Sequence, residues 1–110
     1  MAGALSDYNT AIQTDPNYAE AYMARGILKA LKLGDSQGGL EDLDRLIEID
    51  PSQTNYTLRG YTKLALKDNY GAIADLRQVG RIYERKGDTK GYLEVQESIK
   101  GIEAIIKLGA

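Results

Sequence analysis

The chain has 110 residues, of which 43% are hydrophobic and 27% are charged, and its formal net charge is −2. These proportions are ordinary for a soluble globular protein of one domain, and nothing in the overall charge indicates nucleic-acid binding. The sequence contains neither His nor Cys, so the commonest general base, the strongest side-chain nucleophile and the usual zinc ligands are missing. We therefore expect no enzymatic activity, no metal site and no cofactor. No apolar run approaches the roughly 20 residues that span a bilayer, and we expect a cytoplasmic protein.

Apolar residues recur at helical spacing along the chain and predict six helices joined by short turns. In chain order, the expected helices cover residues 2–14, 18–33, 36–49, 54–67, 70–86 and 89–108. Asp15-Pro16 and Asp50-Pro51 end the first and third helices, because the residue before proline disfavours helical backbone.

Two of the predicted turns contain residues suited to a tight change of direction. Gly34-Asp35 predicts a turn between the second and third helices. Lys67-Asp68-Asn69 replaces it between the fourth and fifth helices, where we expect Asn69 to be the left-handed residue.

Two half-units alternate along the chain with a mean period near 34 residues. The two Asp-Pro pairs are 35 residues apart, whereas Arg25-Gly26 and Arg59-Gly60 are 34 residues apart. A third copy of the second half-unit starts near residue 72 and places Asp75 33 residues after Asp42. A one-residue insertion near residues 30–33 and a one-residue deletion near residues 52–55 reconcile these spacings.

At these positions the sequence resembles the tetratricopeptide repeat family, in a style similar to bacterial and often cyanobacterial members. The resemblance covers residues 4 to about 86, and in the fuller unit it rests on Ala19, Tyr22, Gly26, Leu33-Gly34-Asp35, Gly39-Leu40, Leu46-Ile47 and Asp50-Pro51. It implies an all-α fold of antiparallel helical hairpins, stacked as a short right-handed α-solenoid with a C-terminal capping helix. The expected single domain has a partial repeat (second helix only) at 1–16, repeats at 17–51 and 52–86, and the capping helix at 87–110.

The first expected helix corresponds to the second half of a hairpin, and its apolar residues Leu5, Tyr8 and Ile12 need cover from outside that hairpin. Three explanations remain open: the chain is a piece of a longer array, its open end pairs with another copy, or the helix is frayed. In the second case these residues are the self-association surface of a homodimer or larger homo-oligomer.

In this family the first helix of each hairpin lines a concave groove. The resemblance therefore implies a ligand groove lined by Glu20, Met23, Ile27, Thr54, Thr57, Tyr61 and Leu64. Tyr61 is the best candidate anchor, since aromatic side chains often anchor peptides in grooves. The alternative is that Met23, Ile27 and Tyr61 pack on neighbouring helices.

A carboxylate clamp is not expected in this groove. Some chaperone-tail-binding members of the family use Lys and Asn at groove positions to hold a C-terminal carboxylate. Here Met23, Ile27, Thr57 and Tyr61 occupy the corresponding positions, so the sequence departs from that pattern.

Several charged residues allow both a functional and a structural interpretation. Arg25 and Arg59 could contact an anion, but we favour pairing with an acidic residue of an adjacent helix. Glu41, Asp42 and Asp44 could suggest a cation site, but they lie in a predicted helix and we expect them to face solvent.

A basic stripe follows one expected helix and its end, and it consists of Arg77, Arg81, Arg85, Lys86 and Lys90. It could contact an acidic partner, although cations near a helix C-terminus more often stabilise the helix itself.

The leading hypothesis is a protein–protein interaction scaffold that binds a peptide or protein segment in or beside the concave groove, with no nucleic-acid or membrane partner. The alternative is a homo-oligomer that assembles through the uncapped N-terminal helix or the apolar C-terminus, where Ile105, Ile106 and Leu108 lie.

Overall fold

The computed structural model describes residues 2–109, which form helices and turns and include no strand. The elements in order are α1 (Ala2–Thr14), α2 (Ala19–Ile27), η1 (Leu28–Lys32), α3 (Ser36–Ile49), α4 (Gln53–Ala65), α5 (Asn69–Lys86) and α6 (Thr89–Gly109). The all-α prediction is confirmed, and the predicted helix limits lie within two residues of the observed ones. The chain divides into two compact units, Met1–Pro51 and Ser52–Ala110, and the division falls at the predicted boundary between the repeats.

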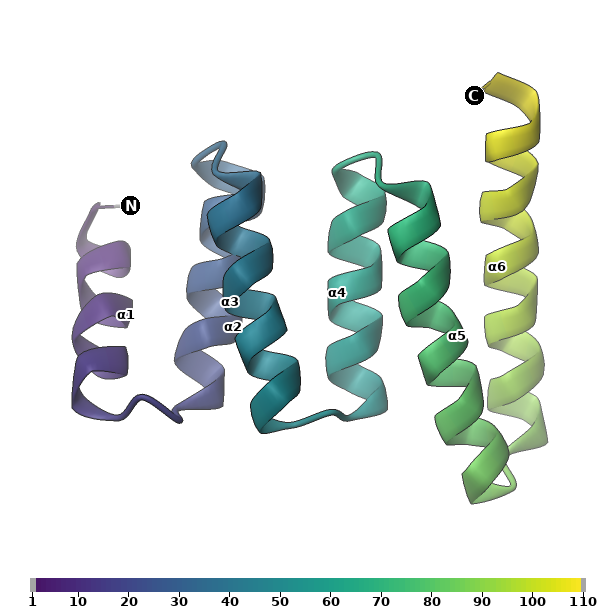
Figure 1. Ribbon diagram of the computed structural model, residues 1–110, viewed down its shortest axis with the longest axis horizontal. Helices are drawn as coiled ribbons and strands as arrows, with labels where there is room; N and C mark the ends of the chain where they lie inside the picture. Colours follow the sequence, from purple (N-terminus) through teal and green to yellow (C-terminus); the bar gives the residue numbers. More distant parts are fainter. Residues whose placement is uncertain (1, 110) are drawn as a thin grey trace. The chain divides into compact units, whose positions relative to one another are not determined.

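The first unit is a helical hairpin with one additional helix. Helix α2 continues into η1, runs antiparallel to α3 and is also contacted by α1 (Figure 1). The buried apolar side chains of this unit are Ala21, Tyr22, Leu28, Ala30, Leu43, Leu46 and Ile47. Two glycines allow the hairpin helices to approach closely. A Cβ on Gly26 would lie 2.9 Å from the carbonyl oxygen of Gly39, and a Cβ on Gly39 would lie 2.6 Å from that of Gly26.

A π-helical turn, η1, ends the first helix of this hairpin. The amide of Leu33 donates to the carbonyl oxygen of Leu28 at 3.0 Å, a span of five residues instead of four. A π turn accommodates one additional residue within an otherwise α-helical segment. The expected insertion near residues 30–33 is therefore absorbed locally, and the helix that was predicted as regular over 18–33 contains this wider turn.

The second unit contains the hairpin of α4 and α5, and α6 packs against α5 (Figure 1). Its core consists of buried side chains from α5 and α6: Ala72, Ile73, Leu76, Val79, Val95, Ile99 and Ile102. Tyr56 and Leu64 of α4 pack against this core from the other hairpin helix, and the partly buried Tyr83 of α5 and Ile106 of α6 also pack against it. The buried residues Val95, Ile99 and Ile102 thus form the face of α6 that contacts α5.

Three helices begin with the same capping arrangement. The carboxylates of Asp35, Asp68 and Asp88 accept hydrogen bonds of 2.9 Å from the amides of Gly38, Gly71 and Gly91 in the first turns of α3, α5 and α6. A side-chain oxygen at this position satisfies an amide that has no partner within the helix. The Gly-rich segment after Gly34 is therefore a turn and a helix start.

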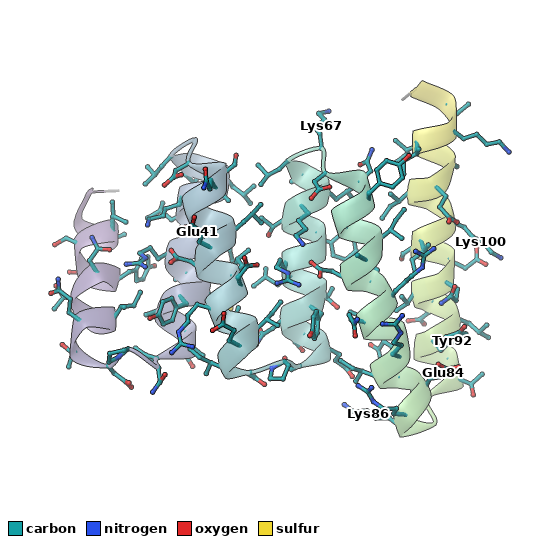
Figure 2. The ribbon with its side chains drawn as sticks, viewed as in Figure 1. Glu41, Lys67, Glu84, Lys86, Tyr92 and Lys100 are labelled. Carbon is teal, nitrogen blue, oxygen red and sulfur yellow. The ribbon has the colours of Figure 1, made fainter. Side chains whose placement is uncertain are left out.

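The left-handed residue of the α4–α5 turn is Lys67, whose φ is 70°, so the prediction of Asn69 is wrong. Asn69 is the first residue of α5. Lys67 precedes the capping Asp68 as Gly34, with φ of 71°, precedes Asp35. Figure 2 shows Lys67 at the end of the hairpin with its side chain directed away from the helices. A left-handed backbone costs a residue with a Cβ about 1–2 kcal/mol.

Candidate functional site

The two recurring arginines are structural. In the first unit, the Nε and Nη2 atoms of Arg25 donate to the two carboxylate oxygens of Asp42 at 2.8 and 2.7 Å. In the second, Arg59 donates in the same way to Asp75 at 2.9 and 2.7 Å. The expectation that these arginines pair with acidic residues of adjacent helices is confirmed, and planar two-bond pairing is the strongest form of this contact.

In each hairpin, a lysine one turn after the arginine also approaches the same carboxylate. The Nζ atom of Lys29 lies 3.8 Å from Asp42, and that of Lys63 lies 3.3 Å from Asp75. The hydrogen bonds that Arg25 donates to the Asp42 carboxylate raise the pKa of Arg25 above its ordinary value, despite the opposing effect of burial. The cation therefore stays charged at every physiological pH.

Of the acidic cluster, Asp42 was predicted to face solvent and does not. Its residue surface is only 6% exposed, because it lies between α2 and α3 with two cations around it. Glu41 and Asp44 are exposed, as expected. The described residues 2–109 contain no group of three or more acidic side chains that could hold a metal ion.

The groove positions predicted on α2 belong to the first unit. Glu20 is exposed there, and Met23 and Ile27 are half-buried. None of these three residues lines the hollows described below.

Two of the positions predicted on α4 line a hollow of about 170 Å³ within the second unit, which we call the α4–α6 hollow. Its lining consists of Thr57, Tyr61, Leu76, Val79, Tyr83, Gly91, Glu94, Val95 and Ser98. Of the other predicted positions, Thr54 is exposed outside this lining, and Leu64 packs against the core. Thr57 and Tyr61 are thus the predicted groove positions that line this hollow, and its lining residues from α5 and α6 were not among the predicted positions.

The α4–α6 hollow has an apolar base and a polar rim. Leu76, Val79 and Val95 are almost completely buried, whereas Tyr61 is 46% exposed. Gly91 leaves room for the ring of Tyr83, since a Cβ at residue 91 would lie 2.6 Å from that ring. The hollow therefore presents aromatic and hydroxyl groups above buried aliphatic side chains, a composition typical of ligand pockets.

The opposite side of the α5–α6 pair carries part of the basic stripe. A second hollow of about 260 Å³ there is lined by Arg77, Arg81, Glu84, Tyr92 and Gln96. Arg77 also lies 3.7 Å from Glu103, a long ion pair between exposed side chains. Charges of both signs line this side, so it is less clearly suited to an acidic ligand than the sequence stripe suggested.

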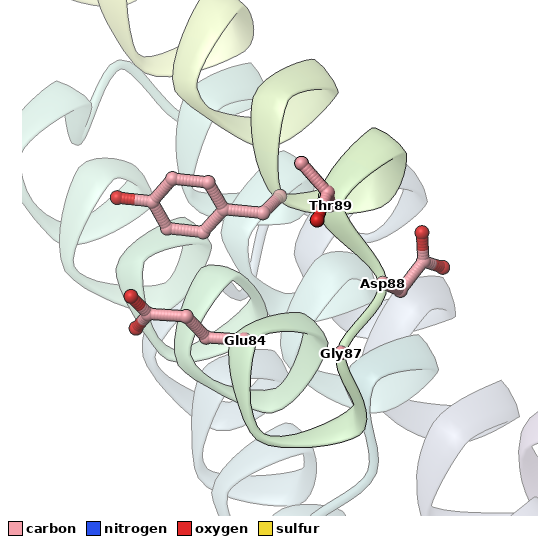
Figure 3. Close-up of a pocket in the computed structure, with 5 residues that line it drawn as sticks. Glu84, Gly87, Asp88 and Thr89 are labelled. Atoms are coloured by element: carbon pink, nitrogen blue, oxygen red, sulfur yellow. The ribbon is translucent and has the colours of Figure 1, made fainter.

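A third hollow, of about 220 Å³, lies at the turn between α5 and α6 and is lined by Glu84, Gly87, Asp88, Thr89 and Tyr92. Figure 3 shows that the carboxylates of Glu84 and Asp88 point in different directions. Asp88 is committed to capping α6 through the amide of Gly91. These two acids therefore do not form a paired site for acid–base chemistry.

The residues considered for self-association lie on α1 and at the end of α6. Leu5, Tyr8 and Ile12 are half-buried on α1, which contacts α2. The side-chain oxygen of Asn9 accepts a hydrogen bond of 3.0 Å from Arg25, which links α1 to the ion pair of the hairpin. Within the described part of α6, Ile105 is 56% exposed and Leu108 is 88% exposed.

No helix within residues 2–109 has the length and apolarity required to cross a membrane.

Comparisons with known proteins point to helical-repeat proteins. No family model matches the chain. The chain is 31% identical over 100 residues to RNA polymerase II-associated protein 3 of Xenopus tropicalis, and 34% identical over 82 residues to the Hsp70-Hsp90 organizing protein of Triticum aestivum. These matches cover 87% and 74% of the chain but only 15% and 14% of the relatives.

A solved structure shares the fold. The crystal structure of MamA superimposes with a TM-score of 0.61 and 20% sequence identity, over 94% of this chain and 68% of that one. The period of the sequence, the capped antiparallel hairpins and these similarities agree with one another. The chain belongs to the tetratricopeptide repeat proteins.

Proposed function

We propose that the chain is a protein–protein interaction module that binds a peptide segment in the α4–α6 hollow. The observation that carries this proposal is that Thr57 and Tyr61, which the family resemblance implies as groove residues, line one hollow together with residues of α6. One relative, the Hsp70-Hsp90 organizing protein of Triticum aestivum, is named for organising other proteins. The chain spans about 15% of such relatives, so this role is transferred here only as a proposal.

The physical basis is the combination of an exposed aromatic ring and a buried aliphatic base. A peptide side chain that enters the hollow covers Leu76, Val79 and Val95 and contacts the ring of Tyr61. Aromatic residues at the centre of an interface frequently account for a large share of the binding free energy. We therefore assign Tyr61 as the main contact of the bound segment.

The test is selection of random displayed peptides on the full chain, followed by affinity measurement with Tyr61→Ala. We expect this variant to lose at least tenfold in affinity for the selected peptides. Tyr70→Ala is the matched control, because Tyr70 belongs to the same unit, is 73% exposed and does not line the hollow. Equal losses in both variants, or a larger loss with Tyr70→Ala, would contradict the proposal.

Homo-oligomerisation is the second candidate, and the exposed Ile105 and Leu108 on α6 favour it. The half-buried Leu5, Tyr8 and Ile12 of α1 form the other surface on which it could rest. Light scattering behind size exclusion, over a hundredfold range of concentration, separates the two ideas. A dimer that Leu108→Lys or Ile12→Lys dissociates supports self-assembly, whereas a monomer throughout removes this candidate.

A further inference from the structure

The charge of the α4–α6 hollow indicates which kind of peptide enters it. Among its lining residues, Glu94 is the one that carries a formal charge at neutral pH. No Lys or Arg lines the hollow. Lys90 lies one turn before Glu94 on α6, and Lys86 donates a hydrogen bond of 3.1 Å to Gln53, so both neighbouring cations lie outside the lining. An anionic ligand would find no cationic partner in the hollow and would be repelled by Glu94.

The hydroxyl group of Thr57, on the rim, favours a ligand of the same sign. The Oγ1 atom of Thr57 donates its proton to the carbonyl oxygen of Gln53 at 2.7 Å. The hydroxyl oxygen of Thr57 therefore offers a ligand only its lone pairs, and the ligand must supply the hydrogen-bond donor. The carboxylate of Glu94 is also an acceptor without a proton to donate. The two groups together suit a ligand that carries several N–H donors.

The aliphatic bottom of the hollow and its tyrosine rings also fit a long cationic side chain. Lys and Arg carry aliphatic stems that pack on apolar surfaces while their charged ends reach polar groups. Leu76, Val79 and Val95 provide such a surface beneath the rim. The rings of Tyr61 and Tyr83 can also face a cation, a contact that contributes about 0.5–1 kcal/mol at exposed sites.

We infer that the α4–α6 hollow selects peptides that place an Arg or Lys side chain in it, with the stem on the aliphatic base and the charged end at Glu94 and Thr57. This inference rests on the proposed function, since it specifies the peptide class that binds at the same hollow. A peptide with an acidic side chain at that position is disfavoured.

The experiment uses the same library of random displayed peptides on the full chain, with residue preferences read position by position. We expect one position enriched in Arg and Lys for the unaltered protein. Glu94→Gln lowers the affinity for the selected peptides by roughly two- to fivefold, in line with one exposed charge contact. Glu94→Lys reverses the preference at that position towards Asp and Glu.

Glu97→Gln is the matched control, because Glu97 lies one turn further along α6, has the same charge and pairs with Lys100 at 3.5 Å outside the hollow. It leaves the preference and the affinity unchanged. Both substituted positions are exposed, and an unchanged circular dichroism spectrum verifies that each of the three variants is folded.

The outcomes separate the inference from the function on which it rests. Peptides that depend on Tyr61 but carry acidic or aliphatic residues at the selected position overturn the inference and leave the proposed function standing. The same holds if Arg and Lys remain equally enriched with Glu94→Gln. If no peptide is enriched in a Tyr61-dependent manner, both proposals are wrong.

Discussion

The two hairpins of the molecule share their polar contacts and differ in how closely their helices pack. Both contain an Arg–Asp pair with two hydrogen bonds and a flanking lysine, and both begin their second helix with an Asp cap. At the helix crossing, however, the first hairpin has glycines on both sides, whereas the second has Gly60 opposite Ala72. A Cβ on Gly39 would meet atoms at 2.6–2.7 Å, but one on Gly60 would meet none closer than 3.2 Å.

The hairpins also differ in the way each reaches its turn. The first contains the π turn η1 and then Gly34 in left-handed conformation, whereas α4 is regular and is followed by Lys67 in that conformation. The repeat thus retains its ion pair and its cap, while helix spacing and turn residues vary. Each of the following predictions tests one element of this difference.

The largest effect is expected from closing the space at the first crossing. Gly39→Ala places a Cβ 2.6 Å from the Cβ of Ala30 and from the carbonyl oxygen of Gly26, and backbone atoms cannot move aside without separating the helices. We predict a loss of about 3 kcal/mol or more in the free energy of unfolding, measured by urea denaturation with circular dichroism.

Gly60→Ala is the control for this substitution. Its Cβ would meet the nearest atom, the Cβ of Asp75, at 3.2 Å, which a small adjustment relieves. Alanine also favours helix by about 1 kcal/mol over glycine, so we expect a stability within about 1 kcal/mol of the unaltered chain. Similar losses in the two variants would mean that the crossings do not differ in closeness.

The shared ion pairs are expected to contribute equally to the free energy of unfolding in the two hairpins. Asp42→Ala and Asp75→Ala each leave an arginine and a lysine without their buried carboxylate partner. We predict a loss of about 2–3 kcal/mol for each, in the same denaturation experiment. A loss confined to one of the two would show that the contact is not equivalent in the repeats.

The π turn is expected to tolerate removal of one residue. Deleting Leu31, which is 46% exposed, lets η1 become a regular α-helical turn in register with the 34-residue period. We predict a change of about 1 kcal/mol or less in the free energy of unfolding. Deleting Tyr61, which is equally exposed in the regular helix α4, rotates the residues behind it and displaces the buried Thr62.

This control deletion should cost about 2 kcal/mol or more, because Leu64 also leaves the core of the second unit. If the two deletions have the same cost, the π turn is not the site of the additional residue.

The smallest expected effect concerns the turns. Lys67→Gly removes the strain of a left-handed lysine, and we predict a stabilisation of about 0.5–1 kcal/mol after the greater freedom of the unfolded glycine is included. The reciprocal variant Gly34→Lys should lose a similar amount, since Gly34 has nearly the same φ. Thermal unfolding of both variants provides the measurement, and shifts of the same sign would contradict the explanation.

Most of the fold could be predicted from the sequence because its signals are local. Pro16 and Pro51 follow helix ends, and the apolar spacing of each segment identifies a helix within two residues of its limits. The left-handed position was misassigned because asparagine is a common left-handed residue. The position relative to the cap is the better signal, since the residue before Asp35 and Asp68 has a positive φ in both turns.

The site was less accessible to sequence reasoning because it depends on packing between helices. Thr57 and Tyr61 follow from the repeat, but Glu94 and Ser98 belong to α6, beyond the part of the chain covered by the family resemblance. The burial of Asp42 was missed because its neighbours in sequence, Glu41 and Asp44, are exposed. Its recurrence as Asp75, opposite the recurring arginines, was the available signal.

The most direct test of the account is nuclear magnetic resonance of the labelled chain titrated with the best selected peptide. We predict that the largest changes in amide chemical shift occur on α4 and α6, around Thr57, Tyr61, Glu94 and Ser98. Shifts centred instead on Arg77, Arg81 and Tyr92, on the other side of the α5–α6 pair, would contradict it.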